Sequence, residues 1–166
     1  ISTTKLVVAD FVALETFCDT LVSDGDGGTE KRCTFNGAFA NDQTLWDSAA
    51  VVLSMCRTKL FPNGDVYRLV IDQAVTPVYE FNIANMLQDS FEMVALDKNQ
   101  RASVIQVDYM DKNQNYKIVP LRVGLTSAGD IKNKVRWPGV GITSQAQAER
   151  MAKHLLYSNA YIKKMY

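Results

Sequence analysis

The 166-residue sequence is 47% hydrophobic and 22% charged, which is typical of a globular protein and excludes a disordered or collagen-like chain. Its 18 basic and 18 acidic residues cancel and form no block of like charge, so neither nucleic acid nor a membrane surface is expected as a partner. The longest apolar run is far shorter than the about 20 residues that a membrane-spanning helix needs.

The two ends of the sequence and its cysteines bear on its context. It begins at Ile1 without Met or a leader and ends at Tyr166 inside a helix-like pattern, which predicts a piece of a longer protein. Cys18, Cys33 and Cys56 show no Cys-x-x-Cys spacing, which argues against a disulfide framework or a zinc knuckle. We interpret them as small buried thiols, with a Cys18–Cys33 disulfide as the alternative.

The first predicted elements are a helix and a strand. Apolar residues recur at three- and four-residue spacing from Ala9 to Val22, as in an amphipathic helix, and a glycine-rich loop follows. Residues 32–39 alternate between apolar and polar side chains, which predicts a strand.

A second helix and a hairpin follow. Asn41 or Asp42 is the predicted N-cap of a helix that runs to about Thr58. The hairpin is predicted at residues 59–71, because Asn63-Gly64 between two β-rich runs supplies the positive φ angles that a tight turn requires.

Beyond Pro77 the pattern becomes strand-rich. In the middle strand Ile105, Val107 and Tyr109 share one face. Pro120 cannot donate a ladder hydrogen bond, which predicts that the third strand lies at a sheet edge or carries a bulge. The predicted strands are 91–96, 102–110 and 116–125, with a turn at 111–115 and a short pairing segment at 135–137.

The last predicted element is a helix capped by Thr143 or Ser144 that runs to about Lys164. Together the elements predict an α+β fold. A helix–strand–helix–hairpin lobe occupies residues 1–76, and an antiparallel sheet packed by the C-terminal helix occupies residues 77–166.

One stretch imitates a calcium-binding loop. Asp19 and Glu30 stand at the first and twelfth positions of an EF-hand spacing, but the sixth position, where the sharp turn needs glycine, is Asp24. We interpret the stretch as an acidic surface loop. No other cluster has usable ligand spacing, so neither a metal nor a cofactor is expected.

Catalytic groups are equally hard to identify. The single histidine, His154, lies in the middle of the last helix, where a partly exposed imidazole without a nucleophile is expected, and no spacing distinguishes a pair of carboxylates. We therefore expect no enzyme. Tyr157, Tyr161 and Tyr166 recur at helical spacing and form a candidate protein-contact face.

Three stretches of the sequence together resemble one family. They are residues 11–22 with the Arg-Cys-Thr-Phe-Asn-Gly run at 32–37, the helix and Asn-Gly hairpin at 45–69, and Gly-Ile-Thr-Ser followed by Gln-Ala-Glu-Arg within 141–156. In order and spacing they are similar to the tail-tip attachment (host-specificity) protein family of long-tailed bacteriophages.

The resemblance implies a non-enzymatic structural component of a phage or prophage tail tip or baseplate hub. It implies a homotrimeric ring in the virion that closes the tail tube, contacts other tail-tip and tail-tube proteins and carries host-recognition parts, after assembly in the bacterial cytoplasm. An isolated piece is expected to be a monomer or a weak oligomer. The alternatives are an envelope-directed hydrolase domain with unidentified carboxylates and a secreted binding module.

Overall fold

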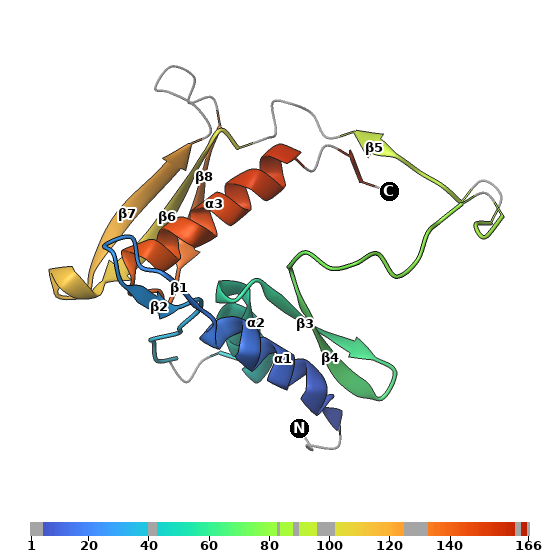
Figure 1. The fold of residues 1–166 in the computed structure, drawn as a ribbon, viewed down its shortest axis with the longest axis horizontal. Coiled ribbons are helices and arrows are strands. Elements are labelled where there is room, and N and C mark those ends of the chain that lie inside the picture. Colours follow the sequence, from blue (N-terminus) through green and yellow to red (C-terminus); the bar gives the residue numbers. More distant parts are fainter. Residues whose placement is uncertain are drawn as a thin grey trace.

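The protein is an α+β structure in which one long helix packs on a small sheet and contributes with it most of the buried core (Figure 1). The computed structural model describes residues 5–39, 43–82, 84–87, 90–95, 102–124, 133–161 and 164–165. The predicted fold class is confirmed. Within these residues, no helix combines the length and apolar character that crossing a membrane requires.

The central sheet has the strand order β7-β6-β8. Strand β6 (Val104–Asp111) pairs antiparallel with β7 (Lys117–Gly124), which makes β7 an edge strand and confirms the placement of Pro120. Strand β8 (Lys134–Gly139) pairs parallel with β6, so the sheet is mixed rather than wholly antiparallel. Strand β7 ends and β8 begins beside Val104, at the same end of β6 but on opposite sides of it. Strand β8 therefore runs opposite to β7 and parallel to β6.

Helix α3 (Gln145–Tyr161) packs on this sheet and creates the core. The predicted inner face of β6 is confirmed, and its side chains contact Ala148, Ala152 and Leu156 of α3. The helix ends at Tyr161 rather than near Lys164, because residues 164–165 form strand β9. The buried core cluster consists of Met55, Ala102, Ile105, Val107, Tyr109, Ile142, Ala148, Ala152 and Leu156.

The N-terminal segment differs from the prediction. Helix α1 (Val8–Asp19) ends before Leu21, and the predicted strand at 32–39 is wrong. Strands β1 (Leu21–Ser23) and β2 (Thr29–Lys31) instead close a short hairpin around the glycine-rich loop. The Asp24 carboxylate stabilises that loop by accepting hydrogen bonds from the Asp26 and Gly28 amides.

Helix α2 (Leu45–Met55) also starts later than predicted. Its N-cap is Thr44, whose hydroxyl accepts a hydrogen bond from the Asp47 amide at 3.1 Å. The predicted caps, Asn41 and Asp42, lie outside the described residues. The helix ends before Thr58 because Arg57 adopts a positive φ of 54°, which turns the chain into the next strand.

The predicted hairpin is confirmed. Strands β3 (Thr58–Asn63) and β4 (Val66–Ile71) pair antiparallel through a two-residue loop, and Gly64 takes the positive φ of 60° at its first position. The predicted turn before β7 is likewise confirmed as a 3₁₀ helix at Lys112–Gln114.

Beyond β4 the described residues between 72 and 95 form a long arm that leaves the body (Figure 1). It returns at strand β5 (Val94–Ala95), which pairs antiparallel with β9 (Lys164–Met165) near the C-terminal end. The strand predicted at 91–96 is therefore shorter than expected, and its last residue lies outside the described ranges.

Candidate functional site

The segment after β2 and the start of α3 form an interlocking contact. The Gln147 side chain is 3% exposed and pairs with the backbone of Thr34: its Oε1 accepts from the amide at 3.2 Å and its Nε2 donates to the carbonyl at 2.9 Å. The Asn36 amide donates to the Gly141 carbonyl at 2.8 Å, and the Asn36 side chain donates to the Thr143 hydroxyl at 3.0 Å. Two of the three sequence stretches that resemble the phage family therefore pack directly on each other.

Arg150 extends this contact to the β1–β2 hairpin. Its guanidinium pairs with Glu30 at 2.7 Å and donates to the backbone carbonyls of Ser23 and Arg32, each at 3.1 Å. Ser144 donates to the other Glu30 oxygen at 2.7 Å. The acid that imitated the twelfth position of a calcium loop is thus engaged by a cation of α3 and by the hydroxyl of Ser144, which directly precedes α3.

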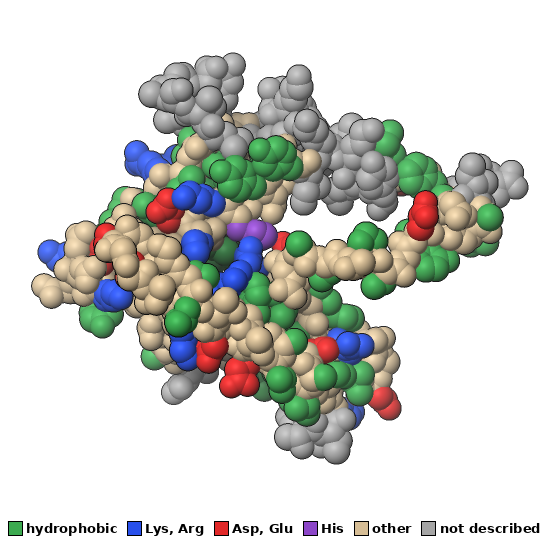
Figure 2. Space-filling model, viewed as in Figure 1, with side chains coloured by type: hydrophobic (Ala, Val, Ile, Leu, Met, Phe, Trp, Pro, Cys, Tyr) green, Lys and Arg blue, Asp and Glu red, His purple; other side chains and the backbone are tan. Residues whose placement is uncertain are grey.

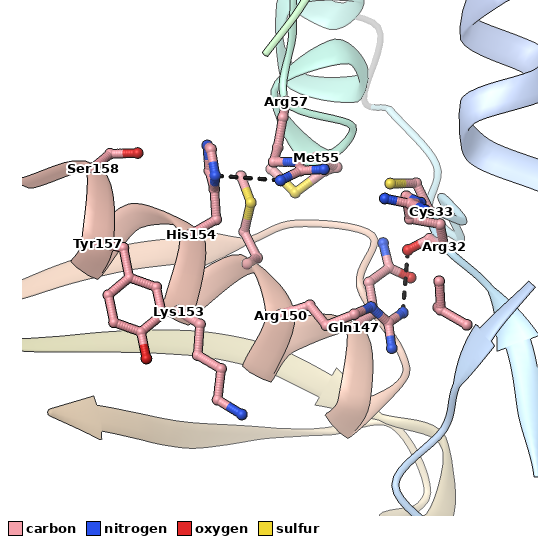
Figure 3. Close-up of a pocket in the computed structure, with 12 residues that line it drawn as sticks. Arg32, Cys33, Met55, Arg57, Gln147, Arg150, Lys153, His154, Tyr157 and Ser158 are labelled. Atoms are coloured by element: carbon pink, nitrogen blue, oxygen red, sulfur yellow. Dashed lines mark hydrogen bonds between the residues drawn. The ribbon is translucent and has the colours of Figure 1, made fainter. Parts of the chain in front are cut away.

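A cavity of about 380 Å³ lies between this contact and the C-terminal end of α2 (Figure 3). Its wall is rich in cations, and Lys and Arg side chains gather beside the single histidine on the surface (Figure 2). The charged and titratable side chains lining it are Arg32, Cys33, Arg57, Arg150, Lys153, His154 and Tyr157.

His154 is more constrained than the sequence suggested. Its Nε2 lies 3.0 Å from an Asp72 oxygen, and its Nδ1 lies 3.3 Å from Arg57 Nη1. Burial and then the Arg57 charge lower the pKa of His154. The neutral ring therefore donates from Nε2 and accepts at Nδ1. The imidazole is partly exposed, as expected, but both of its nitrogens are engaged, so neither is available to the Cys33 thiol as a base.

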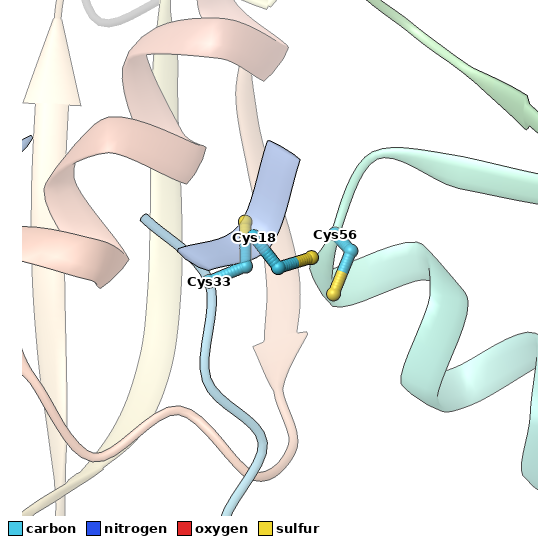
Figure 4. Close-up of side chains that lie close together, drawn as sticks. All are labelled: Cys18, Cys33 and Cys56. Carbon is cyan, nitrogen blue, oxygen red and sulfur yellow. The ribbon is translucent and has the colours of Figure 1, made fainter. Parts of the chain in front are cut away.

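The structure brings all three cysteines together. The Sγ atoms of Cys18, Cys33 and Cys56 lie within 4.8 Å of one another, and each approaches from a different segment (Figure 4). Hydrogen bonds from Cys18 and Cys56, together with the charges of two nearby arginines, lower the pKa of Cys33. The hydrogen bond with Cys33 raises the pKa of Cys18, and the hydrogen bonds with Cys18 and Cys33 raise the pKa of Cys56.

Sequence reasoning missed this cluster because its members lie far apart in the chain. Cys18 lies in the last turn of α1, Cys33 follows β2, and Cys56 follows α2. No spacing motif connects them; only the packing of three elements does. The three thiols are free, as expected, but only Cys56 is buried, and Cys18 and Cys33 are half-buried.

The tyrosine face is seen only in part. The Tyr157 and Tyr161 rings stack with centroids 5.9 Å apart, both side chains are exposed, and Tyr157 also lines the cavity. Tyr166 lies outside the described residues. The protein-contact role of this face stays a prediction.

These features define a module held together by polar contacts between distant motifs, with a cationic cavity beside them. The model of the family described as "Putative phage tail protein" matches residues 46–165, so the chain belongs to that family. The family resemblance found in the sequence is confirmed.

Two curated relatives agree with this assignment, and both are named tip attachment protein J. The chain is 24% identical to that of Escherichia phage SECphi27 over 152 residues and 28% identical to that of Escherichia phage SECphi4 over 151 residues. Each alignment covers 86% of this chain but only 12% and 13% of the respective relative, so the chain spans a small part of their length. Membership of this family supports a structural role in a phage tail.

Proposed function

We propose that the chain is a non-enzymatic building block of a phage tail tip or baseplate hub. Three copies would assemble around the end of the tail tube, contact other tail-tip and tail-tube proteins, and carry the host-recognition parts of a longer polypeptide. The family match and the names of the relatives support the location. The bacterial cytoplasm would be the place of assembly and the virion tail tip the final location.

The exposed apolar side chains of the arm support the proposed assembly into a ring. Val78 is 97% exposed and Leu87 is 83% exposed. Among the ring contacts of the described residues, Tyr79 and Phe81 pack only edge to face against each other, with centroids 5.0 Å apart. In the space-filling view the arm extends from the body with apolar side chains along it (Figure 2). Large apolar side chains gathered on an exposed segment mark a protein-contact surface. A neighbouring copy in a ring would cover them.

Photo-crosslinking in assembled particles tests this role. A photoreactive residue at Val78 of the full-length protein should yield covalent dimers and trimers, whereas the same residue at Asp26, in the exposed β1–β2 loop, should yield far fewer. Antibodies against the chain should label the tail tip in electron micrographs.

Two results would contradict the proposal. One is labelling that is absent from the tail, and the other is crosslinking at Val78 that stays within one chain. Release of soluble fragments from purified cell envelopes by the chain would favour the hydrolase alternative instead.

A further inference from the structure

We propose that Cys18, Cys33 and Cys56 form a thiolate site for one soft metal ion, Zn²⁺ or Cu⁺. The three sulfur atoms already lie within 4.8 Å of one another. Sulfurs at the corners of a tetrahedron around zinc, with bonds of about 2.3 Å, lie roughly 3.8 Å apart. Side-chain rotations that close each gap by about 1 Å or less would therefore complete the site.

The ligand type selects the class of ion. Thiolates are soft donors that favour Zn²⁺ and Cu⁺ over hard cations such as Mg²⁺ or Ca²⁺. Among the described residues the cluster contains sulfur ligands alone. Three thiolates suit trigonal Cu⁺, and they suit Zn²⁺ when water takes the fourth position. His154 is not a fourth ligand in this arrangement, because Asp72 and Arg57 engage its two nitrogens.

The surroundings carry the positive charge that such a site needs. Binding releases one proton from each thiol, so the zinc complex has a net charge of −1 and the copper complex −2. Arg57 and Arg150 lie close enough to Cys33 to act on it electrostatically. The guanidinium groups of Arg32 and Arg57 lie 4.8 and 5.1 Å from the ring centroid of Phe17, the residue before Cys18.

Two of these arginines, Arg32 and Arg150, also have an unused buried Nε donor among the described residues. In the part of the chain that the structure describes, the buried Nε atom of Arg32 has no hydrogen-bond partner, although Arg32 directly precedes Cys33. A buried N–H without an acceptor is costly, and a metal-bound thiolate is an acceptor that would relieve it. The bound ion would join α1, the segment after β2 and the end of α2, and so stabilise the folded chain.

Metal titration of the reduced, metal-free chain tests the site. Zn²⁺ is added against a competing chromogenic chelator, and Cu⁺ is added in a separate anaerobic titration. We expect one ion per chain, protection of all three thiols from alkylation, and a raised melting temperature with the preferred ion. The ion that binds more tightly in these two titrations is the preferred ion.

Single substitutions then assign the ligands. Cys18→Ser, Cys33→Ser and Cys56→Ser should each weaken binding more than about 100-fold, since even residues behind the ligands change metal affinity by about 10- to 100-fold. Met55→Leu removes the neighbouring thioether sulfur with little change in volume and should leave binding unchanged. If a serine variant does not fold, alkylation of the unchanged chain with and without the ion still decides the question.

Three outcomes would overturn the proposal. The first is failure of both ions to bind at equimolar concentration. The second is binding that survives all three serine substitutions, and the third is a Cys18–Cys33 disulfide in protein purified with the ion present.

Discussion

The side-chain amide of Gln147 replaces a missing β-strand partner for Thr34. Residues 32–39 form no strand, so the Thr34 amide and carbonyl have no ladder to join. Gln147 supplies one acceptor and one donor at 3.2 and 2.9 Å, and its Oε1 also accepts from the Thr34 hydroxyl at 2.9 Å. A single helical side chain thus satisfies the backbone of a segment 113 residues away.

Gln147→Ala should destabilise the protein strongly. It leaves the Thr34 amide and carbonyl without partners in a part-buried site, and each such group costs about 1–3 kcal/mol. We expect a loss of about 2–4 kcal/mol in the free energy of unfolding, measured by urea denaturation. Gln145→Ala, at an exposed position of the same helix, is the matched control and should change stability by less than about 0.5 kcal/mol. Equal losses in the two variants would contradict this role of Gln147.

Gly141→Ala should cost more than the same change at Gly64. Both glycines have positive φ angles, 78° and 60°, so alanine is strained at either site by about 1–2 kcal/mol. A Cβ at Gly64 meets nothing within 4 Å, whereas a Cβ at Gly141 would overlap the ring of Phe35. That overlap should add about 1–3 kcal/mol.

A double variant separates overlap from backbone strain. Phe35→Leu should recover part of the loss caused by Gly141→Ala and none of the loss caused by Gly64→Ala, as measured by chemical denaturation. Additive losses for Phe35→Leu and Gly141→Ala would show that the ring and the glycine do not interact.

The protonation of His154 can be observed directly because the chain has one histidine. Burial and the Arg57 charge lower its pKa, while Asp72 raises it. An NMR titration should show an imidazole midpoint below the ordinary value of about 6.5. Arg57→Gln should move the midpoint up and Asp72→Asn should move it down.

Stability should follow the same titration. Because the pKa of His154 is lower in the folded protein, the unfolded chain takes up the proton at a higher pH than the folded protein does. The contribution of neutral His154 to the free energy of unfolding is therefore complete above about pH 6.5 and falls as the pH drops below that value. Melting temperatures at pH 7.5 and 5.5 should therefore differ more for the unchanged protein than for His154→Gln. A midpoint above 6.5 would contradict this assignment.

The ion pair between Asp10 and Arg68 should contribute to acid sensitivity. Arg68 Nε and Nη2 donate to the two Asp10 oxygens at 2.8 and 3.0 Å, and the Leu69 amide donates to one of them at 3.1 Å. These bonds, chiefly those from Arg68, lower the pKa of Asp10. The stabilisation that the ionised Asp10 gives the folded protein is complete above the pKa of Asp in the unfolded chain, about 3.9. It is lost as the pH falls through the lower pKa that Asp10 has in the folded protein.

Thermal melts at pH 6 and pH 3 test this contribution. Asp10→Asn should be less stable than the unchanged protein at pH 6, and the difference should shrink at pH 3. Asp26→Asn, in the exposed β1–β2 loop, should show no such convergence. A constant difference for Asp10→Asn across the range would exclude the proton-linked explanation.

The sequence correctly predicted the elements that depend on residues close together in the chain. The β3–β4 hairpin follows from the Gly64 turn, and the inner face of β6 follows from alternation. The β1–β2 hairpin was missed because three-residue strands are too short to show a period, and the parallel pairing of β8 was missed because no local pattern encodes a partner. The division at residue 76 stays a prediction.

The functional residues were harder to find for the same reason. Gln147 is a polar side chain, but it lies one helical turn before Met151 on the buried face of α3, and that position was the available signal. The sequence contained no signal for the cysteine cluster, because the cluster depends on three elements that meet only in the folded chain.

The separation between Thr34 and Gln147 also determines when the protein can finish folding. During synthesis the segment after β2 leaves the ribosome long before α3, which carries its hydrogen-bond partners. Contacts across such a distance require a large loop to close and are formed slowly. The N-terminal third must therefore wait, with its cysteines accessible, until α3 has left the ribosome. A nascent chain stalled before residue 141 should remain sensitive to protease in this region.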